Sequence, residues 1–165
     1  MVAARHLYNR GVKTYVILAA DISQLKEVPL HQWMILKNMG IDAEGDTINS
    51  ADLVLDALLG YGLIGNPRPM IAKYIQMANN QSAPILSLDT PSGLETTSGL
   101  PQQPTIRAKA TMTLALPKTG ILEPSAKEYV GDLYLADIGV PADLYKKVFN
   151  LNVPTLFSED TIISI

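Results

Sequence analysis

Residues 52–59 read D-L-V-L-D-A-L-L and run straight into G-Y-G-L-I-G-N at residues 60–66. The first segment is a short apolar run closed by a glycine, which is typical of a strand buried in a sheet. A helical spacing of apolar residues then follows over Pro69–Asn79, starting at Ile71. A buried strand, a glycine-rich turn and an amphipathic helix in this order are half of a βαβ unit.

The same alternation extends from this unit toward both ends of the chain. We expect helices over Val2–Arg10, Pro29–Gly40 and Pro141–Phe149, and further strands over Lys13–Ala20, Pro84–Leu88, Thr111–Leu116 and Asp132–Asp137. Alternating strands and helices imply an α/β fold with a mostly parallel central sheet, right-handed connections and helices on both faces. Ligands of such sheets bind beyond the carboxyl ends of the strands, which is where the polar and glycine residues collect here.

The composition is that of a globular protein with one core. Of 165 residues, 47% are hydrophobic and 18% are charged, and 13 basic against 16 acidic side chains leave a net charge of −3. This balance argues against a general nucleic-acid binder, although it leaves room for a local basic patch. No apolar stretch approaches the roughly 20 residues that span a bilayer, and the first residues show no signal peptide. We therefore expect a cytoplasmic protein with no nucleic-acid or membrane partner.

Cysteine is absent, and the two histidines are His6 and His31. This excludes a disulfide framework, a thiolate nucleophile and a cysteine zinc site, and it argues against a multi-histidine metal site. Ser92 stands in T-P-S-G, which lacks the first glycine of G-x-S-x-G, and neither histidine completes a recognisable triad. Acyl transfer is therefore not expected.

Gly60, Gly62 and Gly65 match G-x-G-x-x-G after a predicted strand and before a predicted helix. Asp89 lies 24 residues beyond Gly65 at the end of the next strand, close to what a dinucleotide fingerprint requires. Glycines in this context let the backbone approach a pyrophosphate at a helix N-terminus. The alternative is a tight turn that needs glycine for positive φ, and Pro67 delays the helix relative to a standard Rossmann turn.

Polar side chains follow the ends of three predicted strands. Asp56 lies inside an apolar strand, where a carboxylate is costly unless it is paired, hydrogen-bonded or bound to a cation. Asp89 and Ser92 stand in the turn D-T-P-S-G, and with Asp56 they could hold a hard cation or supply an acid/base pair. Asp56 could instead bond backbone amides, and Asp89 could be an Asx-turn residue. Lys118, in L-P-K-T-G, could contact a substrate phosphate, neutralise the carboxylates or be an ordinary solvated surface residue.

Five motifs occur in a fixed order along the chain. They are V-A-A-R-H-L (2–7), L-D-A-L-L-G-Y-G-L (55–63), L-D-T-P-S-G-L (88–94), A-K-A-T-M-T-L-A-L-P-K-T-G (108–120) and G-D-L-Y-L-A-D-I-G-V-P (131–141). Each motif alone is modest, but the five in register make a specific match. The chain resembles the NAD(P)H-hydrate epimerase family, also called the YjeF N-terminal domain, from residue 2 to about Asp143.

The resemblance implies a Rossmann-like three-layer αβα sandwich that repairs nicotinamide cofactors. Members of the family interconvert the R and S forms of the hydrates NADHX and NADPHX, so that a partner NAD(P)H-hydrate dehydratase can restore the S form. The resemblance places a potassium ion on Asp56 and Ser92. It assigns hydrate contacts to Asp89 and to the glycine-rich loop of Gly60, Tyr61, Gly62, Leu63, Ile64, Gly65 and Asn66. Lys118 is expected to face the same cleft.

The resemblance also carries an expectation for the start of the chain. Family members have a G-x-G-N-N-G-G-D-G loop immediately before the V-A-A-R-H-L helix, where this chain has Met1. The predicted helix also has no capping residue before it. We therefore expect residues 1–165 to form a single domain of this family, truncated by its opening strand and first phosphate loop. A homodimer is compatible with the same resemblance.

The leading hypothesis is an isomerase, an NAD(P)H-hydrate epimerase with Asp89 and Lys118 as catalytic residues. Inversion would proceed through ring opening or through loss and return of water, and both routes need a group that exchanges a proton at the hydroxyl. The alternative from another class is a non-catalytic nucleotide-binding or protein-interaction module of the same fold. An NAD-dependent dehydrogenase ranks last, because no catalytic histidine or lysine stands in an obvious place for hydride transfer.

Overall fold

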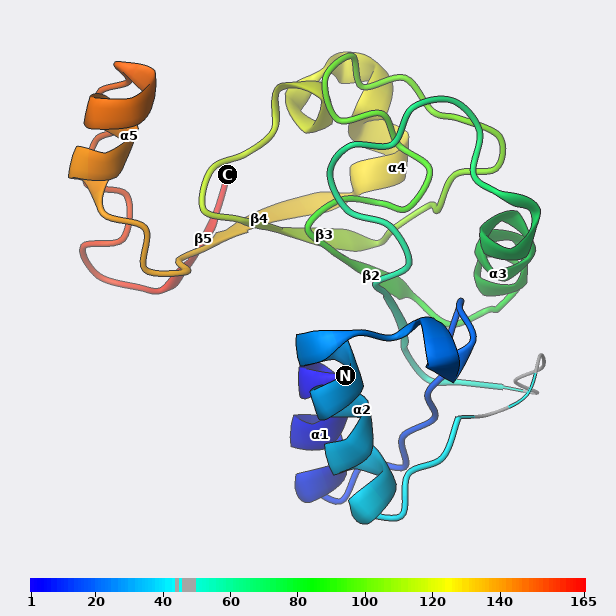
Figure 1. Cartoon of the computed structure of the whole chain (residues 1–165). Coiled ribbons are helices and arrows are strands. Elements are labelled where there is room, and N and C mark those ends of the chain that lie inside the picture. The colour runs from blue at the N-terminus through cyan, green and yellow to red at the C-terminus, as the bar shows by residue number, and fades with distance from the viewer. Residues whose placement is uncertain (44, 46–49) are drawn as a thin grey trace. The chain divides into compact units, whose positions relative to one another are not determined.

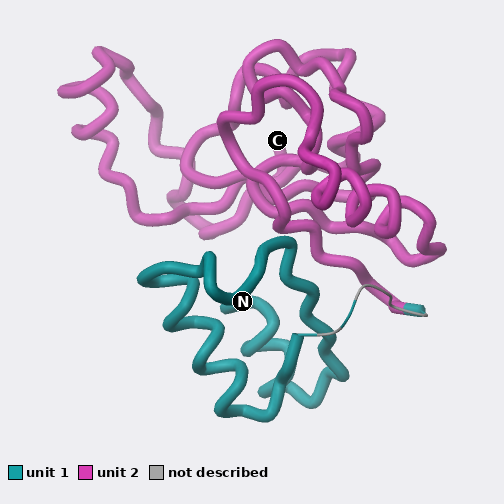
Figure 2. The backbone as a smooth tube through the Cα atoms, turned by 45° about the vertical axis from the view of Figure 1, so that its right-hand side comes forward, with its two compact units in different colours: residues 1–50 teal, residues 51–165 magenta. Residues whose placement is uncertain are grey.

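Two compact units, Met1–Ser50 and Ala51–Ile165, make up the chain (Figure 2). The computed structural model describes residues 1–43, 45 and 50–165. Each unit has a hydrophobic core of its own. Among the described residues, no helix is both long and apolar enough to cross a membrane. All the candidate site residues belong to the second unit.

The first unit contains two helices around a buried apolar cluster. α1 (Val2–Asn9) and α2 (Glu27–Asn38) are separated by a segment that includes a short 3-10 helix, η1 (Ile22–Gln24). The cluster centres on the buried side chains of Trp33, Leu36 and Ile41. Both predicted helices are confirmed, with ends that differ from the prediction by one or two residues.

The predicted strand Lys13–Ala20 is wrong. Among the described residues of this unit, only Val16 and Ala43 make a β contact, an isolated parallel bridge. Residues that are β-branched or aromatic favour a strand only where a neighbouring strand completes the hydrogen-bonded ladder. In the described part of this unit no such strand is present, and Val16 and Leu18 instead pack against the Trp33 cluster.

The second unit is built on a five-stranded sheet in the order β1-β2-β3-β4-β5 (Figure 1). The strands β1 (Val54–Asp56), β2 (Ile85–Leu88), β3 (Ala110–Leu114) and β4 (Asp132–Ala136) are parallel. β5 (Ile162–Ser164) pairs antiparallel with β4 and is absent from the prediction, because its three residues carry no pattern that separates them from loop. The predicted α/β class and mostly parallel sheet are confirmed, with strands shorter than expected.

Helices and turns pack on this sheet through two apolar clusters. α3 (Pro69–Asn79) has the predicted bounds, and its Ile75 packs with Ile85 of β2. The second cluster joins Leu133 of β4 to three short helical segments, η2 (Thr119–Leu122), η3 (Pro124–Ala126) and α4 (Lys127–Val130). α5 (Ala142–Phe149) follows β4 as predicted but has no buried residue, and it projects away from the sheet (Figure 1).

Glu95 closes the loop that follows the D-T-P-S-G turn. One of its carboxylate oxygens accepts a hydrogen bond of 2.9 Å from the amide of Thr97, and the other accepts one of 2.7 Å from the amide of Ser98. Hydrogen bonds from Ser98 and then Thr97 lower the pKa of Glu95 from 4.5 to about 2. The charged carboxylate is therefore the form that holds the loop.

This loop contact predicts a dependence of stability on pH. A lowered folded-state pKa contributes stability that is complete above the unfolded value of 4.5 and is lost as the pH falls toward about 2. Between pH 5 and pH 2 the wild-type protein should lose more unfolding free energy than a Glu95→Gln variant, in which this group no longer titrates. Urea unfolding of both proteins across that range measures the difference, and parallel pH profiles would contradict it.

Candidate active site

The carboxyl ends of the parallel strands bring the predicted side chains to one edge of the sheet. Asp56 ends β1, Asp89 directly follows β2, and Lys118 follows β3 by four residues. β1 and β2 are neighbours, with Asp56 opposite Ser87. The expectation that Asp56, Asp89 and Ser92 lie at the ends of adjacent strands is thereby met, but they form two separate networks.

Asp56 is the centre of the first network and has 3% of its surface exposed. Its Oδ1 accepts hydrogen bonds from the Ser92 hydroxyl at 2.6 Å and from the Leu58 amide at 3.3 Å. Its Oδ2 accepts from the Ser87 hydroxyl and the Ser92 amide, both at 2.8 Å. Burial raises the pKa of Asp56, while the hydrogen bonds from Ser92, Ser87 and Leu58 oppose that rise. The carboxylate is therefore costly to bury but fully hydrogen-bonded by the chain.

Ser92 links this carboxylate to the start of the glycine-rich loop. Its Oγ accepts a hydrogen bond from the Leu59 amide at 2.9 Å. The same hydroxyl has two acceptors within reach, Asp56 Oδ1 at 2.6 Å and the Leu59 carbonyl at 3.3 Å, but only one proton to donate. The hydroxyl can therefore turn from one acceptor to the other without losing its hydrogen bond.

The donor set suits a singly charged hard cation. It offers a carboxylate and a hydroxyl, which are both oxygen ligands. A cation that took Asp56 Oδ1 would leave the Ser92 hydroxyl its second acceptor. The described residues hold no group of three or more His, Cys, Asp or Glu side chains around a common point. One carboxylate matches the charge of a monovalent ion better than that of a divalent one.

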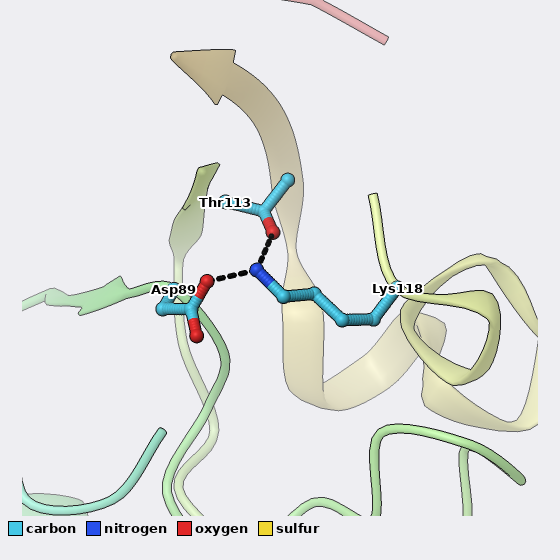
Figure 3. A network of polar contacts seen from close by, with 3 residues as sticks. All are labelled: Asp89, Thr113 and Lys118. Atoms are coloured by element: carbon cyan, nitrogen blue, oxygen red, sulfur yellow. Dashed lines mark hydrogen bonds and ion pairs between the residues drawn. The ribbon is translucent and has the colours of Figure 1, made fainter. Parts of the chain in front are cut away.

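Asp89, Lys118 and Thr113 form the second network (Figure 3). Lys118 Nζ makes an ion pair with Asp89 Oδ1 and donates a hydrogen bond of 3.1 Å to Thr113 Oγ1. The side chains of Asp89 and Lys118 are 22% and 17% exposed, so the pair is partly sheltered yet open to solvent. A base beside an acid with access to solvent is an arrangement that can exchange protons with a bound molecule.

The backbone at Asp89 adopts a φ of +72°, which is uncommon for a residue other than glycine. Its amide donates to the Met112 carbonyl of β3 at 2.8 Å, so the turn is tied to the sheet. Within the described residues the carboxylate is bonded by Lys118 rather than by a nearby amide, which argues against a mere Asx turn. Strained backbone of this kind is common where a side chain is held for function.

The glycine-rich loop passes directly beside Asp89. A Cβ added to Gly60 would lie 3.4 Å from Asp89 Oδ2, whereas at Gly62 and Gly65, both with positive φ, it would meet nothing within 4 Å. Within the loop Tyr61 is 75% exposed and Ile64 is 93% exposed. At its far end Asn66 Oδ1 accepts a hydrogen bond of 2.9 Å from the Gln103 amide, which anchors the loop. Leu63 lies between these exposed positions and is partly buried.

Two polar residues of the site are not among the sequence predictions. Ser87 donates to Asp56, and Thr113 accepts from Lys118; both are fully buried in strands. A signal for them exists, because Ser87 interrupts the apolar run I-L-S-L and Thr113 alternates with apolar residues in T-M-T-L. Such a pattern marks one strand face as polar, but the partner on the neighbouring element is not visible in the sequence.

Comparison with known proteins places the chain in a family. The family model described as the YjeF-related protein N-terminus matches residues 1–120. An NAD(P)H-hydrate epimerase of Dehalogenimonas lykanthroporepellens is 38% identical, covering 88% of this chain and 58% of that protein. A bifunctional NAD(P)H-hydrate repair enzyme of Moorella thermoacetica is 34% identical over 87% of this chain and 29% of its own length. The chain thus spans somewhat more than half of the length of the first relative and less than a third of the length of the second.

A solved structure supports the same fold. The crystal structure of the yeast protein YNL200c superposes with a TM-score of 0.72 at 20% sequence identity, covering 99% of this chain and 70% of the yeast chain. At this identity the likeness concerns the fold alone. The match of the family model over residues 1–120, which is most of the chain, shows that the chain belongs to the YjeF N-terminal family.

Proposed function

We propose that this chain carries the epimerase activity for NAD(P)H hydrates, interconverting the R and S forms of NADHX and NADPHX. The observation that carries the proposal is the Asp89–Lys118 pair, partly exposed at the carboxyl edge of the sheet and flanked by the backbone of Gly60. Relatives named NAD(P)H-hydrate epimerase support it. We also propose that a partner dehydratase consumes the S form and that the protein works in the cytoplasm.

The two charged groups supply complementary proton transfers. In the ring-opening route, Asp89 takes the hydroxyl proton as the carbonyl forms, and Lys118 gives a proton to the ring nitrogen as its bond to that carbon breaks. Closure on the opposite face reverses both transfers. In the dehydration route, Lys118 protonates the hydroxyl as it leaves as water, and Asp89 takes a proton from the water that returns to the opposite face. That proton then passes from Asp89 to Lys118 across their ion pair. Both routes return the two groups to their starting state, as an isomerisation requires.

The glycine-rich loop is the proposed contact for the rest of the hydrate. The positive φ angles of Gly62 and Gly65 and the open space around them let a phosphate approach their backbone. Tyr61 and Ile64 extend from the same loop with most of their surface free. A dinucleotide bound along Gly60–Asn66 would bring its hydrated ring to Asp89, which lies beside the first residue of the loop.

This placement predicts the effect of a methyl group at Gly60. In Gly60→Ala the new Cβ would lie 3.4 Å from Asp89 Oδ2 and cover one face of the carboxylate. Because Gly60 does not need a positive φ, the fold should lose little stability. We expect the hydrate to bind about tenfold more weakly, or ~1.4 kcal/mol, with unfolding free energy within about 0.5 kcal/mol of wild type. Calorimetric titration and urea unfolding measure the two quantities, and unchanged affinity would contradict the placement.

We further propose that Asp56 and Ser92 bind a potassium ion. A monovalent cation here would offset the buried negative charge and add positive potential near the phosphates of a bound hydrate. Ion binding to the folded state should raise Tm as potassium replaces sodium at constant ionic strength. Ser92→Ala should abolish that increase, whereas Ser87→Ala, which removes a hydrogen bond to the same carboxylate, should keep it. Equal Tm in both salts would contradict the proposed site.

The direct test of the epimerase is chemical. The protein is mixed with a sample enriched in one epimer of NADHX, and the R to S ratio is followed by chromatography against a protein-free control. We expect the ratio to relax toward equilibrium faster than the control. If the hydrate binds but the R to S ratio changes no faster than in the control, the result would support the non-catalytic nucleotide-binding module. If the protein neither binds the hydrate nor changes the ratio, the assignment of the site would be refuted.

A further inference from the structure

We propose that Thr113 is a positioning residue for catalysis, fixing the Lys118 ammonium group against Asp89 and toward the bound hydrate. The inference rests on the proposed function and deepens it. Thr113 lies on β3, one strand away from the turn that carries Asp89, and its side chain is fully buried. Its Oγ1 accepts a hydrogen bond of 3.1 Å from Lys118 Nζ (Figure 3).

A lysine at this place needs a second contact to be held still. Its ammonium is a compact charge at the end of a flexible four-carbon chain, and fixing that chain costs rotamer entropy. The ion pair with Asp89 is partly exposed, and by itself it engages one of the three N–H donors of the ammonium. The Thr113 hydroxyl belongs to a rigid strand and lies out of solvent, so it defines the position that the carboxylate alone leaves loose.

The hydrogen bond to Thr113 also determines how the Lys118 ammonium is oriented. Lys118 has three N–H groups; one faces Asp89 and one faces Thr113. Among the described residues no third acceptor is in contact with Nζ. Because Asp89 and Thr113 bind two of the N–H groups, the ammonium cannot rotate freely and the third N–H group has a fixed direction. This third N–H group is the one available to a bound hydrate.

Thr111 provides the comparison within the same strand. It lies two residues before Thr113, so both side chains belong to the same face of β3. It is equally buried, but its hydroxyl donates to the Val130 carbonyl at 2.8 Å. That hydrogen bond joins β3 to the end of α4 and involves no site residue. The two threonines therefore differ in what they bind, while their burial and strand environment are alike.

The experiment compares the matched variants Thr113→Val and Thr111→Val, which keep the side-chain shape and remove the hydroxyl. We expect Thr113→Val to lower kcat about tenfold with KM within about twofold of wild type, because a displaced acid affects the chemical step. Thr111→Val should leave kcat within about twofold, although it loses a buried hydrogen bond. Thr113→Ser, which restores the hydroxyl, should recover kcat to within about twofold of wild type.

A second measurement separates this inference from the proposed function. Nitrogen-15 NMR detects a lysine ammonium whose protons exchange slowly because it is held by fixed acceptors. The Lys118 signal should be present in wild type, Thr111→Val and Thr113→Ser, and lost in Thr113→Val. If wild type shows this pattern but does not epimerise, the proposed function fails while the positioning contact stands.

The inference is overturned if Thr113→Val retains the Lys118 signal and wild-type kcat, or if Thr111→Val lowers kcat equally. Should Thr113→Val not fold, Thr113→Ala removes the same acceptor with less bulk and takes its place. The wild-type spectrum decides without any variant, because absence of a slowly exchanging Lys118 ammonium would also overturn the inference.

Discussion

Replacing Asp89 with Asn should lower kcat for epimerisation by roughly 10²- to 10⁴-fold, the usual contribution of a general acid–base group. The amide keeps the size of the side chain and tolerates the positive φ that Asp89 adopts. It cannot take a proton, and it replaces the ion pair by a contact between the Lys118 ammonium and an uncharged amide. The R to S ratio of the hydrate, followed over time with each protein, measures the loss.

Asp137→Asn is the matched control for this variant. Asp137 directly follows β4 as Asp89 follows β2, and its Oδ1 accepts a hydrogen bond of 2.7 Å from the Gly139 amide. We expect it to leave kcat within about twofold of wild type, because it does not contact the Lys118 network. Full activity in Asp89→Asn, or equal losses in the two variants, would remove Asp89 from the proposed proton transfers.

Gly93→Ala should destabilise the protein by roughly 3 kcal/mol or more, as the sum of backbone strain and overpacking. Gly93 is the glycine of D-T-P-S-G and has a φ of +100°. A Cβ there would lie 2.4 Å from the Pro104 carbonyl oxygen and 2.7 Å from Thr105 Cα, and both are backbone atoms that cannot rotate away. Urea unfolding gives the change in free energy.

The control for Gly93→Ala is Gly62→Ala. Gly62 has a φ of +96°, close to that of Gly93, but an added Cβ would meet nothing within 4 Å. It should therefore show only the cost of the left-handed backbone, about 1 to 2 kcal/mol. The excess in Gly93→Ala measures the close approach of residues 104–105 to the turn, and equal destabilisation of both variants would show that this approach is not tight.

The hydrogen bonds of the D-T-P-S-G turn explain why Gly93→Ala would also disturb the proposed cation site at Asp56 and Ser92. The Gly93 carbonyl accepts hydrogen bonds from the Gln102 amide at 2.9 Å and from the Thr105 hydroxyl at 2.8 Å. The preceding Ser92 carbonyl accepts from the Ile106 amide at 2.9 Å. A shift of this turn moves Ser92 away from Asp56, so the fold and the proposed cation site depend on the same glycine.

Local sequence patterns were sufficient to predict those helices and strands that are defined by their own residues. The periodicity from Ile71 and the proline at its start predict α3 with the bounds that the structure has. The short apolar runs predict the four parallel strands, because such runs are closed by glycine, proline or aspartate. The strand expected at Lys13–Ala20 fails, since a strand depends on a partner that the run itself does not contain.

By itself the sequence determined the fold class, the family and the edge of the sheet at which the candidate site residues lie. Parallel strands share one carboxyl edge, so Asp56 and Asp89 were expected near each other if their strands are neighbours, and the structure shows that they are. The tertiary structure alone decided that they belong to separate networks, with Asp56 bound to Ser87 and Ser92 and Asp89 paired with Lys118. It also shows the hydrogen bond from Lys118 to Thr113. Those contacts depend on strand register and on the reach of side chains between elements, and neither is encoded in a local pattern.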